Sequence, residues 1–313
     1  MKTIAALLGL LALQDPVSPD LLEYAPGSRL GGSLEVGPCA GFETVMNQWG
    51  DRFKQHHPDL RGARVERTTG TMPEALIAGT IRYGILGRRW TDAEVEQFRG
   101  QWGCFPTWLA VGSDALSIVV HPENPLKTLS TDQITTMFSP ARRRDSKAGV
   151  AWGDVGLRGD DWSKVPIRCY VPPKESRARL AFQQRLLAGG ACREGVREVA
   201  STEEVLSAVS EDPYGVGFVG GVAKADGVRV VPVMPSPGAR GVEPTADSVL
   251  SLTYPLSWRI YVAVRKVPGS PVDSDVAEFL KLILSRDGQE ILAADGMIPV
   301  TGRFARKELQ KLK

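Results

Sequence analysis

The sequence predicts an α/β fold of about two domains, and three observations support this prediction. Short apolar segments alternate with amphipathic ones, beginning with residues 33–37, 42–57 and 63–67, and this alternation is typical of folds with a mostly parallel sheet. Residues 116–120, with the sequence LSIVV, are a continuous apolar run of the kind found in buried strands. The 313 residues are enough for about two domains.

The first half of the chain is expected to contain three strand and helix pairs. A strand over 33–37 precedes a helix over 42–57, in which apolar residues recur at helical spacing until Pro58 ends it. The other two pairs are a strand and a helix at 63–67 and 73–79, and a strand and a helix at 83–86 and 91–99.

The second half continues this pattern after the breaker-rich sequence HPENPL. Ser130 is expected to cap a helix over 131–138, and a pair of glycines, 189 and 190, is expected to end another. The expected strands are 167–171, 216–219, 228–233 and 260–264, and the remaining helices are 176–187 and 275–284. No internal repeat is visible, which argues against solenoids and propellers.

The composition excludes several classes of function. Lys and Arg number 38 against 36 Asp and Glu, a net charge of +2, which is too small for a protein that binds nucleic acid through bulk charge. The chain has only three His and four Cys, with no CxxC or HExxH motif, so we expect no metal and no cofactor. Because the net charge is so small, a charged ligand would have to be bound by the local arrangement of a few groups.

The N-terminus carries the only long apolar run, at residues 4–13 after Lys2. It is too short to span a bilayer and is typical of a secretory signal, so we predict a signal peptide over 1–14 and an exported protein. A frayed N-terminal helix is the alternative. Residues 15–32, rich in Pro, Gly and Ser, are predicted to be a linker. The four cysteines could form two disulfides or stay buried as free thiols.

Three turns before predicted helices are candidate anion sites, since a helix N-terminus offers unpaired N–H groups and a partial positive charge. They are residues 37–42, 68–71 and 174–177. Each also has a purely structural explanation. Thr71 and Glu74 have the spacing of a capping box, and Ser176 could be a plain helix cap. The basic run 142–144 is most simply a solvated loop.

The order of several segments resembles the phosphate-binding proteins of bacterial ABC importers, in the type II periplasmic binding-protein superfamily. The resemblance covers most of the chain from Ser33 to Val300. Its best-matching stretches are FKQHHP at 53–58, GRRWTDAE at 87–94, DALSIVVHPENPL at 114–126, LSTDQI at 129–134, YGVGFV at 214–219, YPLS at 254–257, SRDGQE at 285–290 and GMIPV at 296–300.

The resemblance implies a two-lobed fold with a mixed sheet in each lobe and a ligand cleft between them. Lobe 1 is expected to comprise residues 33–116 and 225–313, and lobe 2 residues 117–224. It further implies a monomeric, exported, non-enzymatic protein that binds phosphate or a related oxyanion and delivers it to an ABC importer permease. The alternative is a degenerate member that acts as an envelope scaffold without a ligand.

The resemblance also implies the ligand-binding residues, which are Ala40, Gly41, Thr69, Gly70, Thr71, Arg88, Ser176 and Arg177. The sequence departs from the family pattern at several of these places. The first loop has no hydroxyl group, Gly87 replaces a serine, Arg177 replaces a glycine, and Pro172 stands where an arginine is common. An enzyme is disfavoured because no nucleophile elbow and no paired carboxylates stand out.

Overall fold

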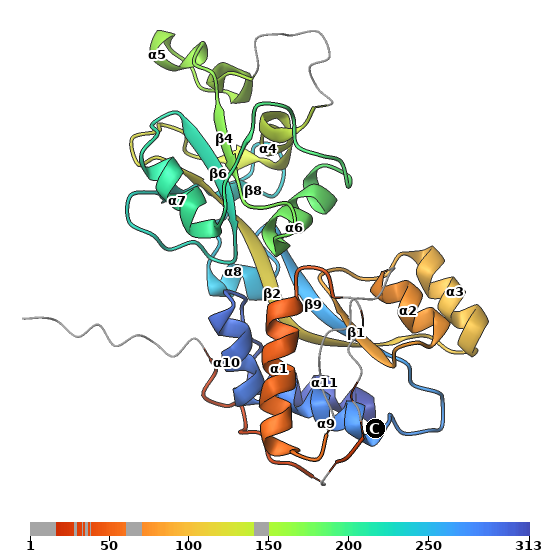
Figure 1. Ribbon diagram of the computed structural model, residues 1–313. Helices are drawn as coiled ribbons and strands as arrows, with labels where there is room; N and C mark the ends of the chain where they lie inside the picture. The colour runs from red at the N-terminus through yellow and green to blue at the C-terminus, as the bar shows by residue number, and fades with distance from the viewer. Residues whose placement is uncertain are drawn as a thin grey trace, which may run out of the picture.

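The computed structural model describes residues 17–27, 30–32, 34, 37, 39–60, 71–140 and 150–313. Figure 1 shows two lobes, one above the other, with the long strand β2 (Thr107–Val120) running from one into the other. Most helices cover the outer faces of the lobes, whereas α8 (Ala246–Leu250) lies near the waist between them.

Strand β2 belongs to both lobes because its two halves have different partners. Residues 107–115 pair with β9 (Ser257–Val264) in the lower lobe, and residues 116–120 pair with β6 (Gly215–Gly220) in the upper lobe. The order within the main sheet is β1-β9-β2-β6-β4-β5. The edge strands of this path are β1 (Tyr83–Leu86) and β5 (Arg197–Glu198), and β4 (Arg168–Val171) lies between β6 and β5.

The sheet is mixed, so the expectation of a mostly parallel sheet was wrong for the described strands. β1, β9, β2 and β6 pair with one another antiparallel, whereas β4 runs parallel to β6 and to β5. The reason is β9, which comes from late in the chain and inserts antiparallel between β1 and β2. Such long-range pairing leaves no local trace in the order of strands and helices.

The upper lobe contains more of the chain than the expected segment 117–224. β7 (Arg229–Val230) pairs with the upper half of β2, and β8 (Val233–Met234) pairs with β3 (Leu129–Ser130). The expected return to the lower lobe at residue 225 therefore comes too early. The chain returns between β8 and β9.

Residues 17–27 do not form the expected linker. The side chains of Val17, Leu21 and Tyr24 are buried in the main core. The carboxylate of Asp20 accepts hydrogen bonds from the backbone N–H groups of Gly302 and Arg303, both at 2.8 Å, at the start of α11 (Gly302–Leu309). A few apolar side chains anchor this Pro-rich segment to the lower lobe.

The helices of the lower lobe pack through apolar faces. On α1 (Glu43–His56) the buried side chains include Val45, Met46, Trp49 and Phe53, and the Trp49 indole donates a hydrogen bond to the Gly288 carbonyl at 2.8 Å. Besides α11, the other helices of this lobe are α2 (Met72–Ala78), α3 (Asp92–Trp102), α9 (Ser274–Ile283), α10 (Arg286–Ala294) and the short η2 (Gln310–Leu312). The upper lobe has α4 (Thr131–Phe138), η1 (Trp152–Val155), α5 (Asp160–Ser163), α6 (Arg177–Leu186) and α7 (Thr202–Ser210).

Most local predictions agree with the observed elements to within a few residues. β1 and α4 have the predicted bounds, whereas β2 begins at residue 107 rather than 116. The first part of β2 contains Gly112, Ser113 and Asp114, which separate residues 107–111 from the apolar run 116–120 that identified the strand. The predicted signal peptide, the strand at 63–67 and the basic run 142–144 lie outside the described residues, as does most of the strand at 33–37.

The four cysteines are free thiols, so the disulfide alternative is not realised in this structure. Within the part of the chain that is described, no helix is long and apolar enough to cross a membrane.

Candidate functional site

A cavity of about 430 Å³ lies between the lobes, with α6 on one side and β1 and α2 on the other. Four predicted site residues line it, namely Ala40, Thr71, Arg88 and Arg177. The other lining residues are Phe42, Met72, Pro73, Leu86, Gly87, Leu180, Ala181, Gln183, Gln184, Arg185, Gly189 and Trp258.

Thr71 lines the cavity, but its polar groups form the cap of α2. Its Oγ1 accepts a hydrogen bond from the Glu74 N–H at 3.5 Å, and its own N–H donates to the Glu74 carboxylate at 2.7 Å. The structure therefore contains the capping box, which was the structural alternative to an anion site at this turn. Thr69 and Gly70, which precede Thr71, lie outside the described residues.

Arg88 also lines the cavity, with its charge already compensated. Its two terminal nitrogens each donate to a carboxylate oxygen of Glu94 at 2.7 Å. These bonds raise the pKa of Arg88 and lower that of Glu94. Glu94 additionally accepts the Thr91 N–H at the start of α3, so Arg88 is fixed to that helix.

Arg177, the first residue of α6, connects the upper lobe to two carboxylates below it. Its Nε donates to Asp114 on β2 at 2.8 Å, and its Nη1 pairs with Asp295 at the end of α10. Its Nη2 also donates to the Asp295 carbonyl at 2.9 Å. Burial raises the pKa of Asp114 in spite of the guanidinium, because a carboxylate at this depth has lost its hydration.

Gly41 brings the first loop into contact with the start of α6. Its φ of +79° is in the left-handed region that favours glycine, and an added Cβ would lie 3.0 Å from the Arg177 Cα. A side chain at position 41 would therefore push the lobes apart. Ala40, the preceding residue, lines the cavity, whereas Gly41 does not.

Ser176 does not line the cavity, and its hydroxyl is used in the cap at the start of α6. The Oγ donates to the Pro173 carbonyl at 2.7 Å and accepts the Arg179 N–H at 3.2 Å. It acts as the N-cap of α6, which is the structural alternative that the sequence left open.

Arg185 is a cavity residue that the sequence analysis missed. Its Nη2 donates to the Gly87 carbonyl at 2.7 Å, and its guanidinium lies 4.2 Å from the centre of the Trp258 indole. Partial loss of hydration lowers the pKa of Arg185 to about 10. A signal was present, since residues eight apart share one face of a helix, and Arg185 follows Arg177 at that spacing.

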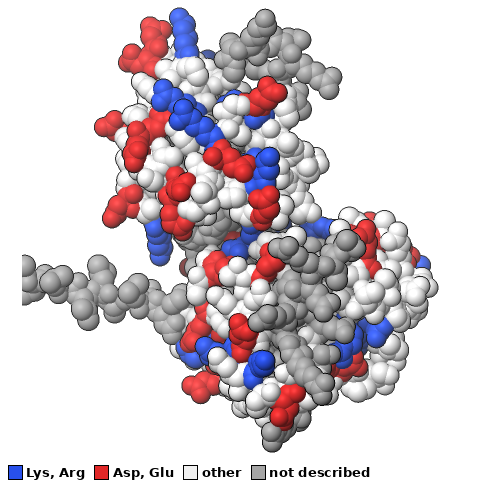
Figure 2. Space-filling view, in the orientation of Figure 1, with Lys and Arg blue, Asp and Glu red and all other residues white. Residues whose placement is uncertain are grey.

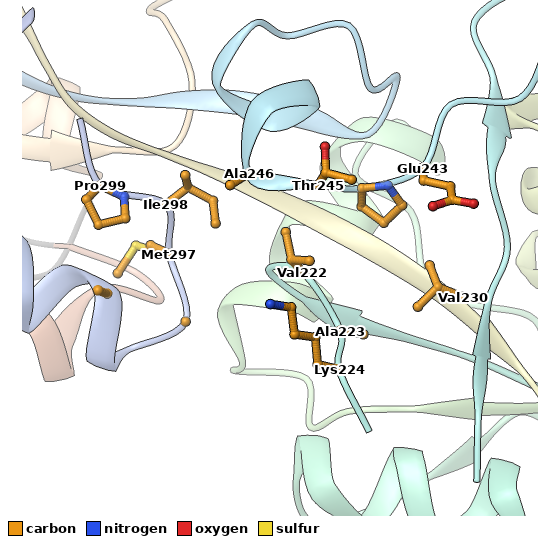
Figure 3. Close-up of a pocket in the computed structure, with 13 residues that line it drawn as sticks. Val222, Ala223, Lys224, Val230, Glu243, Thr245, Ala246, Met297, Ile298 and Pro299 are labelled. Atoms are coloured by element: carbon orange, nitrogen blue, oxygen red, sulfur yellow. The ribbon is translucent and has the colours of Figure 1, made fainter. Parts of the chain in front are cut away.

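A second cavity, of about 830 Å³, lies at the waist beside the segments that connect the lobes (Figure 3). Its walls are largely apolar, with Val222, Val230 and Met297 among them, and its charged residues are Lys224 and Glu243. It contains none of the predicted site residues and no arginine among its lining residues. The cavity beside α6 is therefore the better candidate for an anion site.

Within the described ranges, no group of three or more His, Cys, Asp or Glu side chains is arranged to hold a metal ion.

Comparisons with known proteins give consistent results. A sequence model of the PBP superfamily domain matches residues 40–287. Phosphate-binding protein PstS of Pseudomonas aeruginosa is 34% identical over 310 residues, which cover 99% of this chain and 96% of that protein. A possible phosphate-binding protein from Planctomyces limnophilus has a TM-score of 0.75 at 21% identity, covering 90% of this chain and 98% of that one. An ABC-type phosphate transport receptor from Vibrio cholerae has a TM-score of 0.65 at 18% identity, with coverages of 86% and 100%.

Proposed function

The chain belongs to the PBP superfamily, and on that premise we propose that it is an exported solute-binding protein for phosphate or a related oxyanion. It holds the anion in the cavity beside α6 and delivers it to the permease of an ABC importer. The family resemblance and the two-lobed fold with a mixed sheet, both predicted from the sequence, are confirmed. The names of the relatives support the ligand class and the link to an ABC importer.

The observation that carries the proposal is the distribution of charge around the cavity. Arg88, Arg177 and Arg185 line it, and its described lining contains no acidic residue. Elsewhere charges of both signs are interspersed, as Figure 2 shows for one face of both lobes. A protein with a net charge of +2 thus concentrates guanidinium groups at the junction of its lobes.

Closure of the lobes is the mechanism that the architecture favours. β2 passes from one lobe to the other beside the returning segment after β6, and Ser117 joins the two. Its hydroxyl donates to the Gly221 carbonyl at 2.7 Å and accepts the Ala223 N–H at 3.0 Å. Rotation about these paired segments would open and close the cavity around an anion, as in other two-lobed binding proteins.

The alternative function is that of an envelope scaffold without a ligand. Two observations favour it. The hydroxyls of Thr71 and Ser176 are used as helix caps, and Arg177 is already neutralised by Asp114 and Asp295. In a scaffold, these inter-lobe contacts would hold the lobes together permanently.

Titration calorimetry decides between the two functions. The protein is unfolded, dialysed and refolded to remove any copurified anion, then titrated with phosphate, sulfate, molybdate and arsenate. We expect heat of binding with phosphate and a 1:1 stoichiometry, with the protein monomeric by light scattering. If none of the four anions gives heat, the solute-binding function is wrong and the scaffold is favoured.

A further inference from the structure

The helix α6 carries three arginines whose surroundings differ. Arg177 is paired with two carboxylates, as described above. Arg179 is 3% exposed and lies within the upper lobe. Arg185, near the C-terminal end of the helix, faces the cavity and has no carboxylate partner among the described residues. It is the guanidinium on this helix that is both accessible and uncompensated.

Arg185 is held in place mainly by groups of the other lobe. Its two contacts, the Gly87 carbonyl and the Trp258 ring, come from the end of β1 and the start of β9. Trp258 is itself 5% exposed, so it forms a rigid platform. A guanidinium stacked on such a platform has a fixed plane, which favours two-pronged recognition of an oxyanion.

Gly87 is part of this arrangement. An added Cβ at Gly87 would lie 3.3 Å from the Trp258 Nε1, closer than most side-chain contacts, so a serine there would press on the indole. The glycine therefore keeps the Trp258 platform undisturbed. The carbonyl of the same glycine accepts the hydrogen bond from Arg185.

A guanidinium has five N–H donors, and one hydrogen bond of Arg185, to Gly87, is observed. The partial loss of hydration already noted also means that an anion would regain favourable electrostatic energy for this group. The Asp114 carboxylate raises the pKa of Arg185 and so partly offsets the effect of burial. That carboxylate is hydrogen-bonded to Arg177 and not to Arg185.

We infer that Arg185 is a ligand-contacting residue of the cavity, with its free N–H groups donating to oxygen atoms of a tetrahedral oxyanion while Trp258 and Gly87 fix its orientation. The inference rests on the proposed function and adds to it the cation that contacts the ligand. Because Arg185 comes from the upper lobe and its supports come from the lower one, an anion bound there is held when the lobes are together.

The test compares three variants with the wild-type protein by phosphate titration calorimetry. Arg185→Gln removes the charge, and Arg185→Lys keeps the charge but loses the planar fork. The matched control is Arg265→Gln, because Arg265 lies 4.2 Å from the centre of the Trp102 ring, the same distance as in the Arg185 pair, yet does not line the cavity.

We expect Arg185→Gln to raise the phosphate Kd by about 10- to 100-fold, the effect of losing hydrogen bonds to a charged group. Arg185→Lys should give a smaller rise, and Arg265→Gln should stay within about twofold, inside the usual effect of a surface change. Circular dichroism and thermal melts check that each variant folds, and Arg185→Lys provides the test if the glutamine variant does not.

The results distinguish a failure of the Arg185 inference from a failure of the proposed function. If the wild-type protein binds phosphate and both Arg185 variants bind it as tightly, Arg185 does not contact the ligand, although the solute-binding function stands. If the wild-type protein binds no oxyanion, the function fails and the inference fails with it.

Discussion

The Nε of Arg177 lies 2.8 Å from the Oδ2 of Asp114, and this ion pair joins α6 of the upper lobe to the strand that both lobes share. The Asp114 side chain is 1% exposed and that of Arg177 17%. A pair so deeply buried is costly to break, because the remaining charge has neither water nor a partner. Arg177 thus has a structural role that competes with the ligand-binding role predicted for it.

Arg177→Ala is therefore expected to lower the free energy of unfolding by about 3 kcal/mol near neutral pH. The loss should shrink as the pH falls, because the unpaired Asp114 carboxyl, whose pKa is already raised by burial, takes up a proton. Urea denaturation at several pH values measures this. The control is Arg99→Ala, which removes an exposed pair with Glu96 and should cost under about 1 kcal/mol. Equal losses for both variants would contradict the prediction.

The anchoring of the N-terminal segment can be tested with two adjacent leucines. Leu21 is 5% exposed and belongs to the core, whereas Leu22 is 68% exposed. Leu21→Ala should reduce the free energy of unfolding by about 2–3 kcal/mol, because it removes buried methyl groups and leaves a void. Leu22→Ala should change it by less than about 0.5 kcal/mol. If both substitutions are neutral by chemical denaturation, residues 17–27 are a linker after all.

His57 predicts a pH dependence of stability. It is fully buried, its Nε2 lies 2.8 Å from the Tyr24 hydroxyl, and Glu278 and His56 are its charged or titratable neighbours. Burial, aided by His56 and opposed by Glu278, holds the pKa of His57 below its ordinary value of 6.5. The unfolded chain then binds more protons below pH 6.5, so the free energy of unfolding falls as the pH drops through this region.

Urea denaturation between about pH 8 and about pH 5 measures this decline, which is centred on the range where histidine titrates. His57→Gln, which keeps a polar group beside Tyr24, should flatten the curve. The comparison variant His121→Gln, at a half-buried position outside the Tyr24 and Glu278 cluster, keeps His57 and should retain the decline. A wild-type curve that stays level from pH 8 to about pH 5 would show that His57 is not held neutral.

The buried guanidinium of Arg179 predicts a stabilising substitution. Its Nε and Nη1 are buried without a hydrogen-bond partner among the described residues. Arg179→Leu should therefore raise the free energy of unfolding by about 1–2 kcal/mol, since it removes unsatisfied polar groups from the interior. Arg158→Leu, at an exposed position, should give no gain beyond about 0.5 kcal/mol. A lower melting temperature for Arg179→Leu would mean that Arg179 has a partner in solution.

The cavity should discriminate weakly between phosphate and sulfate. Its described lining has no carboxylate to accept the proton of hydrogen phosphate, and Asp114 and Asp295 are both bound to Arg177. Sulfate has the same shape and charge and lacks that proton, so its Kd should lie within about tenfold of the phosphate value, about 1.4 kcal/mol. Competition calorimetry measures the ratio. A preference for phosphate above about a thousandfold, or 4 kcal/mol, would require a proton acceptor in the site.

Local patterns in the sequence determined the elements of secondary structure and the caps. Helical spacing identified α1, Ser130 marked the start of α4, and the spacing of Thr71 and Glu74 produced the capping box that is observed. These features depend on side chains within one or two turns of each other, so a reader of the sequence alone can find them.

The candidate site was decided by the tertiary structure. Four residues predicted for the site, Ala40, Thr71, Arg88 and Arg177, line the cavity, but nothing in the sequence placed the carboxylates of Asp114, Asp295 and Glu94 against the arginines. Arg185 gained its position from Gly87 and Trp258, which lie 98 and 73 residues earlier and later in the chain. The charge that an arginine offers to a ligand depends on which carboxylates it meets. These contacts depend on how the two lobes pack against each other. The sequence therefore determined the fold class and the helix caps, whereas the packing of distant segments decided the strand directions and which guanidinium is left for an anion.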